Sequence, residues 1–221
     1  MQAERRVLLT GFEPWANILE NPALILAERL HGWRWGGLRV AALVLPVAHV
    51  AASARVAAAL RDLRPSAVLH LGLAAGRPAL TIERWAHNLL DFIEPDTAGA
   101  QPRQQPLRAD GPPRLAATLD VDAAVRTLQA ARVPAAASDD AGAYVCNAVL
   151  YGTLAWAAAE GYSGPVGFVH LPTAEAVSLA DQERALRRLI RLLAQATTPP
   201  LAPDGPAGTP RAPGPAALPT G

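Results

Sequence analysis

The alternation of short apolar runs with helical segments in the first 72 residues most constrains the fold. The apolar runs predict buried strands, and the segments between them have the periodicity of amphipathic helices. Asparagine followed by proline at 21–22 suits the N-cap and the first position of a helix. Strands joined through helices predict an α/β layered fold with a largely parallel sheet. The expected strands are 6–10, 38–45 and 66–71, and the expected helices are 22–31 and 49–63.

The rest of the chain continues this pattern less regularly. At 221 residues the chain fits one domain with a well-buried core. From residue 197 the composition changes, because 197–221 holds eight prolines and four glycines in 25 residues. We therefore predict a single domain at 1–196 and a disordered tail at 197–221. Within the domain we expect a poor strand at 79–90, a long loop at 91–113, a helix at 122–132, strands at 135–138 and 165–171, a helix from near Cys146 to about Glu160, and a last helix at 178–196.

Charge and apolar content exclude several classes of protein. Twenty basic residues against nineteen acidic ones give a net charge of +1, which argues against a nucleic-acid partner. No apolar run reaches membrane-spanning length, and the first residues lack the apolar core of a signal peptide. A single cysteine cannot form an internal disulfide. We therefore expect a cytoplasmic protein with no membrane partner.

Cys146, the only cysteine, lies between a turn-forming cluster at 138–142 and the start of a helix. The unpaired amides and the positive end of the helix dipole at such a junction favour the thiolate over the thiol. A lone cysteine can also be simply a small buried hydrophobe. Its interpretation as a nucleophile therefore depends on partners elsewhere in the chain.

His170 ends a predicted buried strand and is the natural partner for the thiol. A buried histidine needs either hydrogen-bond partners or a catalytic role. The alternative to catalysis is a structural histidine whose ring nitrogens are both hydrogen-bonded. A Cys–His pair also needs a third polar group to orient the imidazole. Glu83 is the best-placed acid, although spacing alone does not select it over the other acids of this region. These are Asp91, Glu94 and Asp96.

Several blocks of the sequence resemble the pyroglutamyl peptidase I family of cysteine peptidases (pyrrolidone-carboxylate peptidases). The blocks follow the order and nearly the spacing of that family from about residue 7 to 193, and only their combination is specific. They are LLTGFEPW at 8–15 with Asn21-Pro22, GLAAGR at 72–77, TIERWAHN at 81–88 with Asp91, Pro95-Asp96, Gly99 and Gln101-Pro102, AGAYVCN at 141–147 with Tyr151-Gly152, and GFVHLP at 167–172.

The resemblance implies a fold, an activity and a set of roles. It implies a three-layer α/β/α sandwich that removes an N-terminal pyroglutamyl residue from peptides, with no metal or cofactor, as a homodimer or homotetramer. By matching position, Cys146 would be the nucleophile, His170 the base and Glu83 the group that orients it. The residues that match the lining of the apolar pocket for the lactam ring are Phe12, Trp15, Tyr144 and Val145.

The sequence departs from the family on the substrate side. Ala16, Asn17 and Ile18 stand where the family usually has two glycines and a glutamate, and Phe92-Ile93-Glu94 replaces Ala-Arg-Ile. The arginine missing at Ile93 is expected to help form the oxyanion site, and losing one such donor can cost about a hundredfold in rate. Two other functions therefore stay open. One is a thiol hydrolase of another small N-acyl or cyclic amide, and the other is a non-catalytic descendant that binds a peptide or partner protein.

Overall fold

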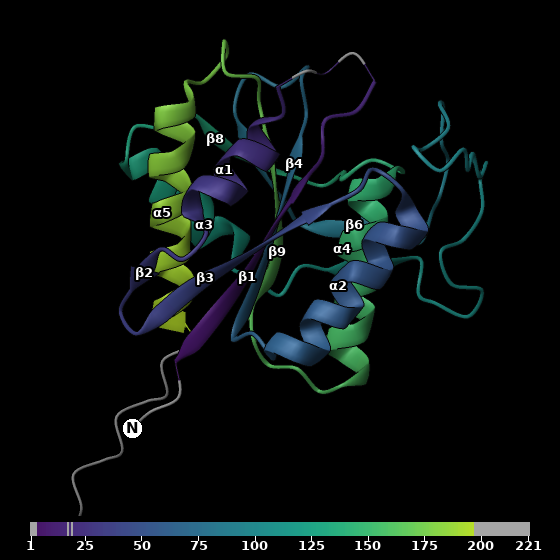
Figure 1. Cartoon of the computed structure of the whole chain (residues 1–221), viewed down its shortest axis with the longest axis horizontal. Coiled ribbons are helices and arrows are strands. Elements are labelled where there is room, and N and C mark those ends of the chain that lie inside the picture. Colours follow the sequence, from purple (N-terminus) through teal and green to yellow (C-terminus); the bar gives the residue numbers. More distant parts are fainter. Residues whose placement is uncertain (1–3, 17, 19, 197–221) are drawn as a thin grey trace, which may run out of the picture.

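The computed structural model describes residues 4–16, 18 and 20–196 (Figure 1). The predicted tail at 197–221 lies outside the described residues, so the boundary at 196 stays a prediction. The strands are β1 (Arg5–Phe12), β2 (Arg34–Trp35), β3 (Leu38–Leu45), β4 (Ala67–Leu73), β5 (Leu80–Glu83), β6 (Trp85–His87), β7 (Arg114–Ala116), β8 (Ala135–Ser138) and β9 (Val166–Leu171). The helices are α1 (Pro22–Leu30), α2 (His49–Leu63), α3 (Val121–Ala130), α4 (Val145–Ala159) and α5 (Leu179–Ala196).

Seven strands form one mixed sheet in the order β2-β3-β1-β4-β9-β5-β8. The neighbours from β3 through β1 and β4 to β9 run parallel. At β5 the direction reverses, because β5 pairs antiparallel with β9 and parallel with β8. The mostly parallel sheet predicted from the alternating pattern is therefore confirmed, and the reversal at β5 is what brings its residues alongside β9.

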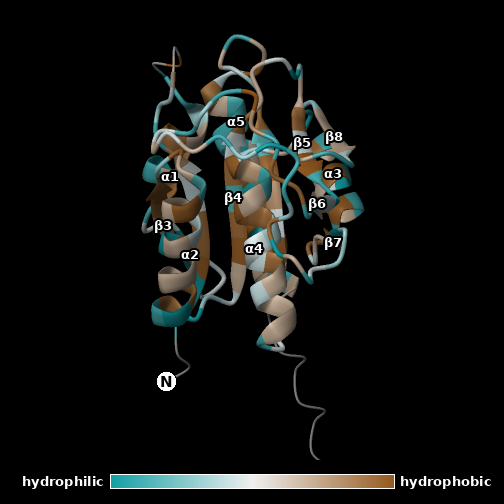
Figure 2. Cartoon of the chain, turned by 90° about the vertical axis from the view of Figure 1, so that its right-hand side faces the viewer, coloured by the Kyte–Doolittle hydropathy of each residue, from teal (hydrophilic) through white to brown (hydrophobic). Residues whose placement is uncertain are grey.

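Helices cover both faces of this sheet and complete the predicted α/β/α sandwich. Helices α1, α3 and α5 lie on one face, and α2 and α4 lie on the other (Figure 1). Each face has its own apolar core, and the strands between them are the most hydrophobic part of the molecule (Figure 2). Successive side chains of a strand point alternately into the two cores. Because both faces are buried, the sequences of the central strands are continuous apolar runs.

The main error of the sequence prediction concerns residues 79–90, which form two short strands instead of one. The chain breaks at Arg84, whose amide donates to Ser138 O (2.7 Å) and whose carbonyl accepts from Ala117 N (2.8 Å). β5 stays in the main sheet, whereas β6 pairs antiparallel with β7 in a separate two-stranded sheet. Strands β2 and β7 were not predicted, because runs of two and three residues carry no readable alternation.

The cap predicted at Asn21 is confirmed, and a serine makes a similar hydrogen bond before α5. The Asn21 side chain accepts from Ala23 N (3.0 Å) and Pro22 occupies the first turn of α1. The Ser178 hydroxyl accepts from Asp181 N (3.1 Å) just before α5. Across the described residues, every helix is too short or too polar to span a membrane.

Ala16 has a φ of +53°, in the left-handed region that favours glycine. This conformation costs an L-residue roughly 1 kcal/mol or more, so Ala16→Gly should relieve strain. Part of the gain is offset by the greater freedom of glycine in the unfolded chain. We expect a net rise in Tm of about 1–3 °C by thermal denaturation, given the size of the domain. Ala109→Gly, at an exposed loop position, is the control and should not raise Tm; equal shifts in both variants would contradict the assignment of strain.

Candidate active site

Cys146 lies in the first turn of α4, as the sequence predicted. Tyr144 is the N-cap residue, and its side chain makes no capping hydrogen bond. The first intrahelical bond runs from Ala148 N to Tyr144 O (3.1 Å), so the amides before Ala148 have no helical acceptor. The thiol therefore lies beside free N–H groups at the positive end of a helix dipole. Such groups can stabilise an oxyanion.

Gly72 on β4 links the thiol to the strand that carries His170. The Cα of Gly72 pairs with the Cα of His170 in the parallel register. A methyl group on Gly72 would lie 2.9 Å from Cys146 Sγ and 2.8 Å from the Phe168 ring. Phe168 and His170 are two apart on β9 and so share a face, with ring centroids 4.6 Å apart. The thiol of α4 therefore lies over Gly72, on the face of the sheet to which His170 of the adjacent strand points.

Glu83 is the acid that the structure brings to His170. Its Oε1 lies 2.7 Å from His170 Nδ1, and both side chains are buried. A carboxylate can only accept, so Nδ1 carries the proton and donates it to Oε1. The neutral imidazole then has Nε2 available as a proton acceptor. The sequence could not choose between Glu83 and the acids of the loop, and the antiparallel register of β5 with β9 makes the choice.

The Glu83 carboxylate is held in its charged form. Burial alone would raise the pKa of Glu83, but hydrogen bonds and charge from His170, with Ser138 and Arg77, hold it below its ordinary value. Arg77 Nη1 donates to Glu83 Oε1 at 2.6 Å. In the sequence Arg77 is visible only as the end of a glycine-rich block, and no local pattern there indicates its bond to Glu83.

The thiol itself does not behave as the sequence predicted. Burial, and then the negative charge of Glu83, raise the pKa of the Cys146 thiol to about 12. Its own backbone amide and Arg77 act in the opposite direction but are outweighed. The residue as a whole is half-buried. The raised pKa disfavours the predicted thiolate at neutral pH, so a base is needed to take the proton.

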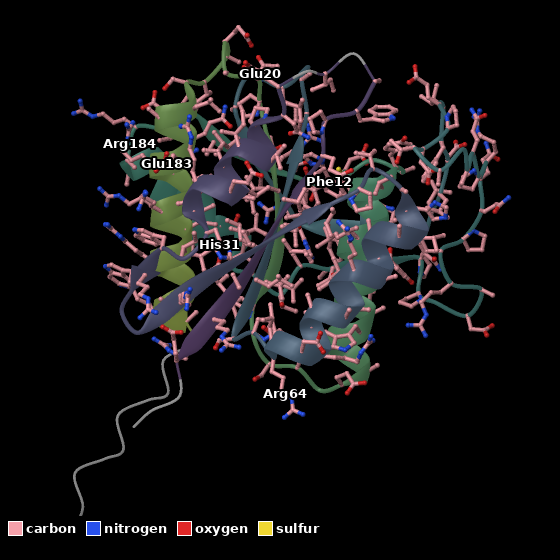
Figure 3. The ribbon with its side chains drawn as sticks, in the orientation of Figure 1. Phe12, Glu20, His31, Arg64, Glu183 and Arg184 are labelled. Carbon is pink, nitrogen blue, oxygen red and sulfur yellow. The ribbon has the colours of Figure 1, made fainter. Side chains whose placement is uncertain are left out.

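An aromatic wall, formed by Trp15, Tyr144 and Phe92, lies beside the thiol. Tyr144 packs against Trp15 and Phe92, with ring centroids 5.2 Å and 4.4 Å away. Its hydroxyl donates to Pro95 O (3.2 Å), which ties the wall to the loop after β6. Phe12 ends β1 on the side of α2 and α4, in the same apolar cluster as Val145, and Cys146 packs against that cluster (Figure 3). Tyr144 and Val145 directly precede Cys146 in the chain, and Phe12 and Phe92 belong to the same apolar cluster, against which Trp15 packs. Their role as the lining of a substrate pocket stays a prediction.

Two of the departures from the family have clear structural settings. Phe92, in place of a small residue, is fully buried and fills space beneath Tyr144. Ile93, in place of arginine, is 84% exposed. Its side chain therefore lies on the surface and is not part of a buried oxyanion site. Asn17 lies outside the described residues.

The loop that carries Phe92 is fixed by Asp96, a contact that sequence reasoning missed. Its carboxylate, 1% exposed, accepts from the amide and Nδ1 of His49 (3.0 and 2.9 Å) at the start of α2. It also accepts from the amides of Ala98 and Ala100 (3.0 and 2.9 Å). Burial alone would raise the pKa of Asp96, but the bonds to His49 and to these amides hold it below its ordinary value. The fold of this loop therefore depends on one charged side chain.

Asp96→Asn should loosen this loop and destabilise the protein. An amide cannot accept all four hydrogen bonds, and bonds to a charged group are worth about 1.5–3 kcal/mol, so a loss of about 2 kcal/mol is expected at pH 7. Because the native pKa of Asp96 is lowered, its contribution is present above the unfolded pKa of about 3.9 and is lost as pH falls through the native value. Urea denaturation should therefore show a difference between native and variant that shrinks below about pH 4. Asp110→Asn, on an exposed loop, should change little, and a pH-independent difference would contradict the account.

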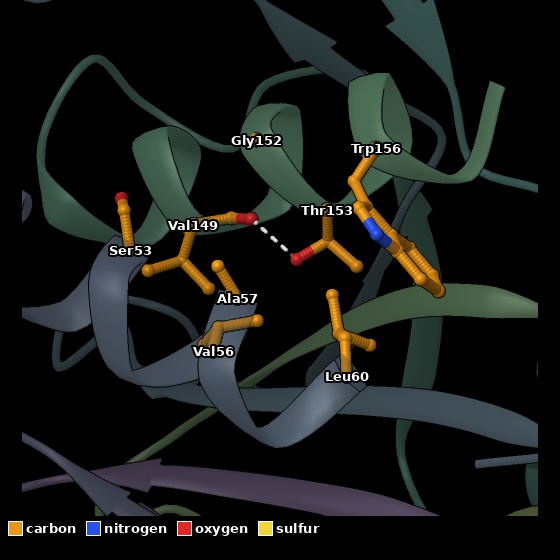
Figure 4. Close-up of a pocket in the computed structure, with 8 residues that line it drawn as sticks. All are labelled: Ser53, Val56, Ala57, Leu60, Val149, Gly152, Thr153 and Trp156. Atoms are coloured by element: carbon orange, nitrogen blue, oxygen red, sulfur yellow. Dashed lines mark hydrogen bonds between the residues drawn. The ribbon is translucent and has the colours of Figure 1, made fainter. Parts of the chain in front are cut away.

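A hollow of about 200 Å³ between α2 and α4 is separate from this site (Figure 4). Its walls come only from those two helices and are mainly apolar. Ser53 and Thr153 carry the hydroxyls of the lining, and that of Thr153 is already satisfied by Val149 O (2.9 Å) and by His70 Nε2 (3.0 Å). His70 is fully buried between Thr153 and Thr10, and burial lowers its pKa to about 3. This histidine is therefore a neutral structural bridge.

Sequence and structure are both similar to those of one group of peptidases. The chain matches the family model described as pyroglutamyl peptidase over residues 5–190. It is 40% identical over 204 residues to the pyrrolidone-carboxylate peptidase of Deinococcus radiodurans, covering 87% of this chain and 94% of that protein. It is 41% identical over 206 residues to that of Cupriavidus pinatubonensis, covering 90% and 94%. The pyrrolidone carboxyl peptidase of Pyrococcus furiosus has a TM-score of 0.84 at 30% identity, covering 87% of this chain and 100% of that chain.

Proposed function

Because the chain belongs to the pyroglutamyl peptidase family, we propose that it is a cysteine exopeptidase that releases an N-terminal pyroglutamyl residue from peptides. The observation that carries the proposal is the buried His170–Glu83 pair on the sheet face that Cys146 Sγ contacts. A structural histidine would not need a charged acid buried beside a thiol. In this proposal Cys146 is the nucleophile, His170 the base and Glu83 the group that orients and stabilises His170.

The aromatic wall would hold the lactam ring. A flat, uncharged ring suits the faces of Trp15 and Tyr144, and Phe12 and Val145 supply apolar surface behind them. Pyroglutamate carries no charged amino group, so its burial against these side chains leaves no cation unpaired. The free amino group of an ordinary N-terminal residue would be costly in the same place. This difference would provide the specificity for a cyclised N-terminus.

Acylation begins with a neutral thiol. Cys146 Sγ attacks the carbonyl carbon that joins the pyroglutamyl residue to the next residue, and its proton passes to His170 Nε2. A C–S bond forms, and the oxyanion faces the amides at the start of α4. Collapse breaks the C–N bond, and Nε2–H gives its proton to the leaving amine. Glu83 stabilises the imidazolium between these two transfers.

Deacylation reverses the roles with water. His170 Nε2 takes a proton from a water molecule, whose oxygen attacks the thioester carbonyl. The C–S bond breaks, pyroglutamate leaves with the new hydroxyl oxygen, and the sulfur regains the proton from His170. The raised pKa of the thiol makes His170 necessary in both halves of the reaction.

Pyroglutamyl p-nitroanilide tests the proposal directly. We expect steady release of p-nitroaniline, stopped by iodoacetamide with one label on Cys146 found by mass spectrometry. Open-chain glutamyl and prolyl p-nitroanilides are the matched substrates and should react far more slowly. Turnover of other N-acyl or cyclic amides, with none of the pyroglutamyl compound, would favour the alternative thiol hydrolase. Binding of peptides without any turnover would favour the non-catalytic descendant.

We also propose that the protein acts as a homodimer or homotetramer in the cytoplasm. The support for the assembly is the family resemblance alone, and a free thiol suits a reducing compartment. Analytical ultracentrifugation at several concentrations should give the mass of two or four chains. A single-chain mass throughout would contradict the assembly, and recovery in a membrane or extracellular fraction would contradict the compartment.

A further inference from the structure

Arg77 joins two parts of the site that are far apart in the chain, the strand that carries Glu83 and the turn at Asp140. Its Nη1 donates to Glu83 Oε1 (2.6 Å) and also contacts Thr81 Oγ1. Its Nη2 donates to Asp140 O (2.8 Å), in the turn that leads to α4 and the thiol. One guanidinium thus fixes the acid to the turn that precedes the nucleophile.

Arg77 is one of two side chains that bond the buried oxygen Oε1 of Glu83. Its Oε1 accepts from both His170 and Arg77. Its Oε2 is buried and has no hydrogen-bond partner within the described part of the chain. Without Arg77, the buried carboxylate would lose a hydrogen bond from a charged donor at Oε1, and a buried charge with fewer partners is costly.

The charges of Glu83 and Arg77 also act on the thiol of Cys146. The carboxylate of Glu83 disfavours the thiolate of Cys146, and the positive charge of Arg77 favours it. The titratable and charged groups around the thiol are Glu83 from β5, His170 from β9, Arg77 from the turn after β4, and Tyr144 at the start of α4. Arg77 is the permanent cation among these groups, because arginine does not lose its proton in proteins.

We infer that Arg77 is a positioning residue of the reaction, which holds Glu83 against His170 and screens the Glu83 charge from Cys146. The guanidinium shape matters for the first task, because only a planar fork bonds the carboxylate and the Asp140 carbonyl together. The positive charge alone is enough to screen the Glu83 charge from Cys146. The inference rests on the proposed function for its effect on turnover, but the effect on the thiol can be measured without any substrate.

Two variants separate the tasks. Arg77→Met keeps the alkyl chain and removes the charge, and Arg77→Lys keeps the charge and removes the fork. Arg84→Met is the matched control, since Arg84 pairs with Asp122 and Asp139 beside the same turn but does not bond Glu83. The readouts are the rate of Cys146 alkylation by iodoacetamide from pH 7 to 10.5, the kcat and KM for pyroglutamyl p-nitroanilide, and Tm.

Arg77→Met should alkylate about tenfold more slowly than the native protein at each pH, as expected for a pKa about one unit higher. Its kcat should fall about 10- to 100-fold with KM changed less than about threefold, because the lost contacts act on the chemical step. Arg77→Lys should alkylate within about threefold of native, yet lose about tenfold in kcat. Arg84→Met should match the native protein in both.

Alkylation of Arg77→Met at the native rate across this pH range would overturn the screening role, whatever its turnover. Native kcat in Arg77→Lys would overturn the positioning role, as would equal losses in Arg77→Met and Arg84→Met. If Arg77→Met does not fold, Arg77→Lys still decides: alkylation about tenfold slower than in the native protein, although the cation is kept, would overturn the inference. Absence of turnover in the native protein would contradict the proposed function and leave the alkylation comparison intact.

Discussion

Replacing Cys146 with serine is expected to abolish release of pyroglutamate while the fold is retained. The hydroxyl is slightly smaller than the thiol and fits in its place above Gly72. It is a far weaker nucleophile towards an amide in a site arranged for sulfur, and removing a nucleophile costs about a thousandfold or more in kcat. Turnover of pyroglutamyl p-nitroanilide, with circular dichroism as the check on folding, measures both halves of the expectation.

The same variant tests the burial of the thiol through the pH dependence of stability. A raised native pKa means that the thiol stabilises the fold fully below its unfolded pKa of about 8.5. This contribution is lost as pH rises towards the native value of about 12. The free energy of unfolding of the native protein should therefore fall relative to that of Cys146→Ser above about pH 8.5. Parallel curves, or residual turnover near native level, would contradict the assignment of Cys146.

Glu83→Gln is expected to have the second-largest effect on activity. The amide has nearly the same shape, but it cannot offer a charged acceptor to both His170 Nδ1 and Arg77 Nη1. The imidazole loses its fixed tautomer and the stabilisation of its cation, and the comparable change in a serine protease costs about 10⁴-fold in kcat. We expect a fall of about 10²- to 10⁴-fold in kcat with a smaller change in KM, measured by steady-state kinetics.

Glu94→Gln is the matched control, because sequence spacing alone could not separate Glu94 from Glu83. Glu94 is exposed on the loop after β6. Its variant should keep near-native kcat, since no step of the proposed reaction uses it. A loss of activity in Glu94→Gln comparable to that in Glu83→Gln would mean that the acid has been assigned to the wrong segment.

The contrast between these two acids shows what local pattern could and could not predict. Periodicity predicted the parallel strands and the position of Cys146 in a first helical turn, because both are local properties. The choice of Glu83 depends on the reversal of β5 against β9, which is a tertiary property with no local signature. The break at Arg84 escaped prediction for the same reason, since partners at Ser138 and Ala117 fix it.

The pKa of the Cys146 thiol shows a second limit of prediction from sequence. Sequence position correctly indicated a helix start, and a helix start favours the thiolate. The size of the opposing effect depends on how deeply Sγ is covered by Gly72 and Phe168, and on the charge of Glu83 nearby. Burial could not be inferred for one residue from its neighbours in sequence, and burial decided the sign of the shift.

The antiparallel pairing of β9 with β5 has a consequence for the stage of folding at which the protein becomes active. Glu83 and His170 are 87 residues apart and meet only when the reversed strand pairs with the parallel part of the sheet. Contacts of such long sequence separation require costly loop closure and tend to form late in folding. A partly folded chain could already hold the thiol at a helix start and an apolar wall beside it. It would be a binder of cyclic amides with no turnover, and catalytic competence would arrive only with the last strand.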